Sequence, residues 1–208
     1  MLCRQTEFFY FQNLRFEKFE MQSWWNKKVE DLSKGMSQKL QFVITVLHEP
    51  KLIILDEPFS GLDPLNANLI KDEIYALAKK GSTIIFSTHR MEQVEEICDH
   101  IVLVNLGKKI LDGSVAGIKQ QYKENNFSIE IKAGSIISSN AIFTIINEAA
   151  SKYLIKINEG YTVNNVLQHI IEQKIELIGF NEVLPSLNEI FIKLVEGTHA
   201  GARAFQNI

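Results

Sequence analysis

Two apolar runs in this sequence lead into side chains that can bind metal ions and move protons. Residues 52–55 lead directly into Asp56 and Glu57, and residues 82–88 lead into His89. One carboxylate of such a pair can hold Mg²⁺, usually through water, while the other activates a water molecule as a nucleophile. Alone, an acidic pair is as typical of a solvated turn as of a catalytic site. A single histidine is more typical of a structural position than of a catalytic one. The elements that precede these residues therefore decide the interpretation.

The two runs are short and rich in β-formers, which is typical of strands buried on both faces of a parallel sheet. Ligands bind such sheets at the carboxyl ends of the strands, where Asp56, Glu57 and His89 fall. Helical spacing predicts three helices and a hairpin around these strands. They are a helix after Ser33 that ends before Pro50, a helix through Ile70 and Leu77 closed by Gly81, a helix from Met91 to Cys98, and a hairpin over residues 101–111 that turns at 105–108.

The order of these elements predicts an α/β fold over residues 26–115, with a parallel sheet covered by helices. Residues 116–208 are predicted to form a small α+β domain without catalytic residues, in which His169 is a solvated or core histidine. Its expected strands are 127–133, 153–159 and 174–180, and its expected helices are 141–150, 163–172 and 186–195.

Residues 1–25 form an atypical aromatic-rich segment with eight of the chain's aromatic residues. Two interpretations stay open for it: an amphipathic helix that contacts a membrane or a partner, or a fragment of helical core. The second is favoured because six charged residues interrupt any long apolar face.

Composition excludes several classes of protein. The 208 residues are 46% hydrophobic and 23% charged, as in folded soluble proteins rather than disordered ones. The net charge of −3 and the lack of a basic block argue against nucleic acid as a partner. Cys3 and Cys98 do not form a secreted disulfide framework, so a reducing cytosol is expected. The sequence contains neither a membrane span nor a signal peptide, and any membrane link is expected to come through a partner.

Four motifs in a fixed order resemble the ATPase subunit of ABC transporters. They are residues 32–36 (LSKGM), 52–58 (LIILDEP), 60–63 (SGLD) and 87–89 (STH). The resemblance covers residues 26 to about 113 and implies a partial P-loop NTPase-like sheet. Residues 116–208, including PSLNEIF at 185–191, resemble the accessory domain that follows the ATPase in some bacterial exporter subunits.

The resemblance implies roles for the residues at the strand ends. Asp56 matches the Walker B aspartate that holds Mg²⁺, and Glu57 matches the general base that orients or deprotonates water. His89 matches the switch histidine that contacts the γ-phosphate, and Asp63 matches the D-loop aspartate that communicates across a dimer. The implied cofactors are ATP and Mg²⁺.

Ser33 and Gly35 match the signature motif, which presents a hydroxyl and backbone N–H groups to the γ-phosphate bound on the opposite protomer. Here Lys34 replaces the first glycine of the usual Ser-Gly-Gly-Gln, and Met36 replaces the glutamine. Lys34 is either a surface charge, which we favour, or an added cation near the phosphate. Gln38 is a candidate to supply the missing amide. The implied partners are a membrane permease and an identical or different ABC ATPase subunit, with the chain in the cytoplasm, peripheral on the inner face of the membrane.

The phosphate-cradling loop G-x-x-x-x-G-K-[ST] does not occur in these 208 residues. Residues 113–119 have the wrong spacing, and Gln12 is a poor match to the family's glutamine loop. We therefore expect an N-terminally truncated member of the family with negligible ATP turnover on its own. Two alternatives are a non-catalytic partner that donates its signature motif to a complete subunit, and an inactive truncated remnant. DNA-associated ATPases with similar motifs are a distant further option, because heptad repeats and a basic surface are missing.

Overall fold

The structure, a computed structural model, describes residues 16–24 and 26–204, with side chains in the last helix described as far as residue 195. Most of the aromatic-rich segment 1–25, Gln12 included, lies outside the described residues. Backbone contacts divide the chain into two compact units, Met1–Arg90 and Met91–Ile208. The sequence-based boundary at residues 115 and 116 falls later, where a hairpin ends and a helix begins, and it stays a prediction.

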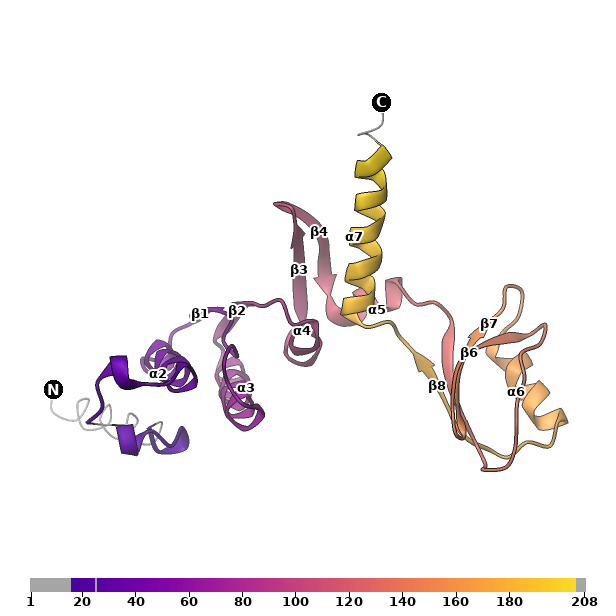
Figure 1. Cartoon of the computed structure of the whole chain (residues 1–208), viewed down its shortest axis with the longest axis horizontal. Coiled ribbons are helices and arrows are strands. Elements are labelled where there is room, and N and C mark those ends of the chain that lie inside the picture. The colour runs from indigo at the N-terminus through magenta and orange to yellow at the C-terminus, as the bar shows by residue number, and fades with distance from the viewer. Residues whose placement is uncertain (1–15, 25, 205–208) are drawn as a thin grey trace. The chain divides into compact units, whose positions relative to one another are not determined.

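The described part of the first unit contains the predicted order of helices and strands (Figure 1). Its elements are η1 (Gln22–Trp24), η2 (Val29–Asp31), α2 (Lys34–Val46), β1 (Leu52–Asp56), α3 (Pro64–Lys79) and β2 (Thr83–Ser87). The buried side chains of the first unit include Phe19, Phe42, Val43, Val46, Ile53, Phe59, Ile70, Ile74 and Leu77.

Side-chain caps explain where the two long helices of this unit begin. Ser33 has extended backbone angles and its hydroxyl accepts a hydrogen bond from the Met36 N–H at 3.2 Å, so α2 starts where predicted. Asp63 caps α3 in the same way, by accepting from the Asn66 N–H at 2.9 Å, and Pro64 occupies the first turn. Both caps place a motif residue at a helix N-terminus.

Strands β1 and β2 pair in parallel, as predicted, from Leu52 opposite Thr83 to Asp56 opposite Ser87. The expectation that both faces of these strands are buried is wrong. Ile53 is only 1% exposed, whereas Ile54 is 68% exposed and Ile85 55%. Strand β1 has apolar side chains on both of its faces, and the described residues of this unit bury only the face that carries Ile53.

The second unit contains the remaining elements of the described chain (Figure 1). They are α4 (Met91–Ile97), β3 (His100–Asn105), β4 (Lys108–Ser114), α5 (Val115–Gln121), β5 (Asn126–Ile131), β6 (Phe143–Ala149), β7 (Lys152–Ile157), α6 (Val163–Glu172), β8 (Leu177–Val183) and α7 (Leu187–Ala204). β3 and β4 form the predicted antiparallel hairpin. Apolar residues of α4, α5, α7 and this hairpin share a small core around Val115, Ile118, Leu187 and Ile190.

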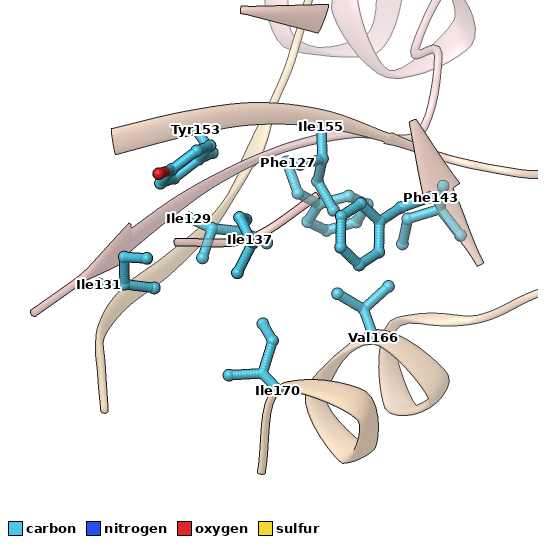
Figure 2. Packing of buried hydrophobic residues seen from close by; sticks show 10 residues of the cluster. Phe127, Ile129, Ile131, Ile137, Phe143, Tyr153, Ile155, Val166 and Ile170 are labelled. Carbon is cyan, nitrogen blue, oxygen red and sulfur yellow. The ribbon is translucent and has the colours of Figure 1, made fainter. Parts of the chain in front are cut away.

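A four-stranded antiparallel sheet of order β6-β7-β5-β8 forms the largest core of the second unit. Alternate residues of β5 and β7, such as Ile129 and Ile155, point to one face of the sheet, where Val166 and Ile170 of α6 pack against them (Figure 2). All three strands predicted for this region exist, as do helices α6 and α7.

The helix predicted over residues 141–150 is wrong, because this segment is strand β6. Ile142, Ile145, Ile146 and Ala149 have helical spacing in the sequence. In the structure the pairing with β7 is irregular: Ile145 lies opposite Ile155 and Asn147 opposite Leu154, so Ile146 is an extra residue. Phe143 is buried whereas Ile146 is 51% exposed, so the apolar residues at helical spacing do not share one buried face.

Candidate functional site

Glu57 follows β1 directly, in a backbone conformation that positions its side chain beside β2. Its φ is +44°, in the left-handed region that non-glycine residues seldom adopt. The Glu57 N–H still donates to the Ser87 carbonyl at 3.0 Å, which continues the parallel pairing by one residue. The Glu57 carbonyl accepts from the Ser60 N–H at 3.0 Å and from the Gln38 side-chain amide of α2 at 3.3 Å. Two strands and one helix thus hold this residue.

The Glu57 carboxylate lies against the residues that follow β2. Its Oε1 atom accepts from the His89 backbone N–H at 3.0 Å and lies 2.6 Å from His89 Nδ1. Its Oε2 atom accepts from the Thr88 hydroxyl at 3.2 Å. The sequence expectation that the acid and the histidine meet at the carboxyl ends of neighbouring strands agrees with this geometry. The His89 side chain is 79% exposed and therefore open to a ligand.

Partial burial raises the pKa of Glu57, but the hydrogen bonds and charge of His89, together with the Thr88 hydroxyl, outweigh it and leave this pKa below its ordinary value. Glu57 is therefore ionised at neutral pH. An ionised carboxylate next to an imidazole can orient a water molecule and accept its proton.

Asp56, the last residue of β1, is exposed and accepts a hydrogen bond from the Ser87 hydroxyl of β2. The described residues contain no group of three or more histidine, cysteine or acidic side chains that could enclose a metal ion. A single exposed carboxylate such as that of Asp56 fits Mg²⁺ bound to a nucleotide, because that ion keeps several waters and takes one or two carboxylates together with phosphate oxygens. Asp56 could supply one such ligand.

The N-terminus of α2 packs closely on the loop before α3. A Cβ atom on Gly35 would lie 3.1 Å from the Gly61 carbonyl oxygen, and a Cβ on Gly61 would lie 2.9 Å from Lys34 Cδ. Gly61 also has a φ of +75°. Both glycines therefore allow a contact that larger residues would obstruct. The aliphatic stem of Lys34 lies over Gly61, while Ser33 and Lys34 stay exposed.

Asp63 is exposed at the N-terminus of α3. Its two oxygens accept from the Asn66 backbone N–H at 2.9 Å and from the Asn66 side-chain amide at 2.5 Å. These bonds, the backbone one first, lower the pKa of Asp63. Asn66 in turn accepts from Lys39 Nζ of α2 at 2.7 Å.

Sequence reasoning missed Lys39 and Asn66. Lys39 is buried in α2, together with Phe42, Val43 and Val46. The sequence does contain a signal for the burial of Lys39. It precedes Phe42 by three residues and Val43 by four, and this spacing places all three on one face of a helix. Lysine is so commonly solvated that the pattern alone does not identify a buried one.

Two family models match parts of the chain. The C-terminal domain of DrrA1-3-like ATP-binding proteins matches residues 113–195. An AAA domain, described as a putative AbiEii toxin of a type IV toxin–antitoxin system, matches residues 9–93. The first agrees with the accessory domain that the sequence resembles.

Comparison with curated proteins identifies relatives of nearly the whole chain. Over 181 residues it is 38% identical to the uncharacterized ABC transporter ATP-binding protein YhaQ of Bacillus subtilis, a match that covers 86% of this chain. The homologues of this chain are ABC transporter ATP-binding proteins. Nod factor export ATP-binding protein I of Rhizobium johnstonii, for example, is 39% identical over 100 residues, or 48% of the chain.

This chain spans only part of the length of these ABC proteins: 60% of YhaQ and 32% of the Rhizobium protein. A solved ATP-binding subunit of an ABC transporter is 32% identical, with a TM-score of 0.53 over 56% of this chain and 49% of that one. The likeness confirms the predicted α/β fold class of the ABC ATPases. No helix among the described residues is both long and apolar enough to cross a membrane.

Proposed function

We propose that this chain contributes the water-activating and signature-motif residues of the ATP-binding and ATP-hydrolysing subunit of an ABC exporter, which acts through a separate membrane permease. The observation that carries the proposal is the ionised Glu57 carboxylate, held by Thr88 and His89 at the ends of two parallel strands. The relative named for Nod factor export supports the direction of transport. The proposal places the chain in the cytoplasm, on the inner face of the membrane.

In this proposal Glu57 is the general base for the attacking water, and His89 contacts the γ-phosphate. Asp56 holds Mg²⁺, which neutralises phosphate charge when bound. Ser33, Lys34 and Gly35 of α2 face the γ-phosphate of an ATP on a second ABC subunit, because a helix N-terminus attracts anions.

The test of hydrolysis requires a phosphate-cradling loop, which these 208 residues do not contain. We would place the corresponding segment of a complete ABC ATP-binding protein before residue 26 and measure ATP hydrolysis and ATP binding by the chimera. Glu57→Gln should lower kcat by about 100-fold or more and change ATP affinity little, since the base acts on water rather than on binding. Glu30→Gln, at a side chain 72% exposed, is the matched control and should hydrolyse normally. Normal turnover in Glu57→Gln would rule the assignment out.

The unmodified chain is expected to show negligible ATP turnover, because nothing in its sequence cradles the phosphates. Rapid hydrolysis by the wild-type chain, abolished in Glu57→Gln, would contradict this expectation. A coupled phosphate-release assay at saturating ATP distinguishes the two results.

A second function is favoured by the exposed, capped N-terminus of α2: a non-catalytic partner that donates this helix to ATP on a complete subunit. Mixing the chain with such a subunit should then raise the subunit's ATPase rate. Ser33→Arg should abolish the stimulation by blocking the helix N-terminus, whereas Gln41→Arg, an exposed position farther along α2, should not. Equal stimulation by both variants would exclude this function.

A further inference from the structure

Lys39 is the cation of α2 that packs among apolar side chains. It is 5% exposed, and the other buried residues of the same helix are Phe42, Val43 and Val46. Burial of an ammonium group costs free energy unless hydrogen bonds or charges compensate for it. A lysine at such a position therefore requires partners that hold it there.

Three features of the surroundings compensate for this burial. Lys39 Nζ donates to Asn66 Oδ1 at 2.7 Å and lies 5.2 Å from the centre of the Trp24 ring, within reach of a cation–π contact. Burial lowers the pKa of Lys39, while the negative charges of Glu20 and Asp63 act in the opposite direction. Lys39 thus faces the cap of α3 from within α2.

The chemistry of these groups fixes the orientation of the Asn66 amide. An ammonium group has hydrogens to donate and cannot accept, so it selects the oxygen end of the amide. The nitrogen end must then face away from Lys39, and it donates to Asp63 Oδ2 at 2.5 Å. Two hydrogen bonds therefore connect the Lys39 ammonium group of α2, through the Asn66 amide, to the Asp63 carboxylate that caps α3.

We propose that Lys39 is a positioning residue that acts through the Asn66 amide to hold the Asp63 carboxylate in a fixed orientation relative to helix α2. The proposal rests on and deepens the proposed function, which gives the N-terminus of α2 its role at the ATP of a second subunit, and the family resemblance implies that Asp63 communicates across the same dimer. In that setting, a movement of α2 would change the hydrogen bonding of Asp63 through the Asn66 amide.

The test is the pKa of the Asp63 carboxyl, followed by carbon NMR in the full chain without nucleotide. Lys39→Met keeps the length of the side chain and removes the donor, which frees the Asn66 amide to rotate. The Asp63 pKa should rise by about half a unit, and the Asn66 side-chain NH₂ signals should shift. Lys39→Arg keeps a donor and should restore a low pKa. Lys79→Met, which removes a charge from the exposed last turn of α3, should leave the pKa unchanged.

A double-mutant cycle separates action through Asn66 from the direct effect of a charge. In an Asn66→Ala chain, adding Lys39→Met should raise the Asp63 pKa by clearly less than it does in the wild-type background, because only the direct effect of the Lys39 charge then remains. A further rise as large as in the wild-type background would overturn the proposal, because Lys39 would then act on Asp63 through space.

If Lys39→Met does not fold, Asn66→Ala alone gives the reciprocal test at a partly exposed position. Loss of the acceptor should lower the Lys39 pKa, measured by nitrogen NMR of its amino group, because the charged form loses a hydrogen bond while the burial stays. An unchanged Lys39 pKa would overturn the proposal. Neither result depends on ATP, so a failure of the proposed function leaves this test intact, and the reverse also holds.

Discussion

Glu57 combines an unfavourable backbone conformation with a favourable side-chain environment. A non-glycine residue at a φ of +44° costs free energy, and such residues persist where the surrounding contacts over-determine them. Here the contacts come from Ser87 to the backbone and from Thr88 and His89 to the carboxylate. The conformation is what lets a residue after β1 place its carboxylate against residues after β2.

The backbone contribution can be measured by comparing Glu57→Ala with Glu57→Gly. Both variants lose the carboxylate, but glycine adopts positive φ without steric cost. We expect Glu57→Gly to be more stable than Glu57→Ala by about 1 kcal/mol in urea unfolding. The opposite order would show that residue 57 is unstrained.

The side-chain contribution depends on pH. Because the pKa of Glu57 is lower in the folded chain than its ordinary value of 4.5, its carboxylate stabilises the fold above that value, and the stabilisation is lost as pH falls through the folded pKa. The difference in unfolding free energy between wild type and Glu57→Gln should therefore be largest near neutral pH and shrink in acid. A difference that stays constant between neutral and acidic pH would contradict the assigned hydrogen bonds.

The meeting of Glu57 and His89 was predictable from the sequence, because the carboxyl ends of adjacent parallel strands share one edge. The hydrogen bonds from Lys39 through Asn66 to Asp63 were not predictable from the sequence. They depend on how α2 packs against α3, and nothing in a helical period specifies the partner of a buried polar side chain.

At the scale of elements, the sequence predicted where α2 begins but not where α3 begins or how the strands are covered. The Ser33 cap acts locally, within the first turn of α2, so residue type and position suffice to predict it. Burial of β1 depends on distant elements. The apolar residues 52–55 predict that both faces of β1 are buried. In the described part of the chain, however, Ile54 and Ile85 are exposed.

Neighbouring residues of β1 provide a matched test of the two faces. Ile53→Thr places a hydroxyl in the core and removes a methyl group, and it should lower the free energy of unfolding by about 2 kcal/mol or more. Ile54→Thr, on the exposed face, should change it by less than about 0.5 kcal/mol. Equal losses, measured by urea unfolding, would mean that a further part of the protein or a second molecule covers Ile54 in solution.

At the scale of the whole chain, the two units have separate cores. Ile129 is fully buried in the sheet of the second unit, whereas Ser128 points to the opposite face. Glu57 and His89 lie in the first unit.

Ile129→Ala should therefore destabilise the second unit by about 2–5 kcal/mol without altering the Glu57 and His89 NMR signals under folding conditions. Ser128→Ala should change stability little. Shifted Glu57 and His89 signals in folded Ile129→Ala would show that the two units are energetically coupled.

The strand order β6-β7-β5-β8 has a consequence for synthesis on the ribosome. β5 is made first of the four strands but lies inside the sheet, between β7 and β8, which are made later. A nascent chain that has emerged only as far as α6 therefore exposes one unpaired edge of β5, with its backbone N–H and C=O groups open to other chains. The edge closes only when residues 177–183 have emerged and paired with β5, so the interval between the emergence of α6 and that of β8 sets how long this edge is open to aggregation.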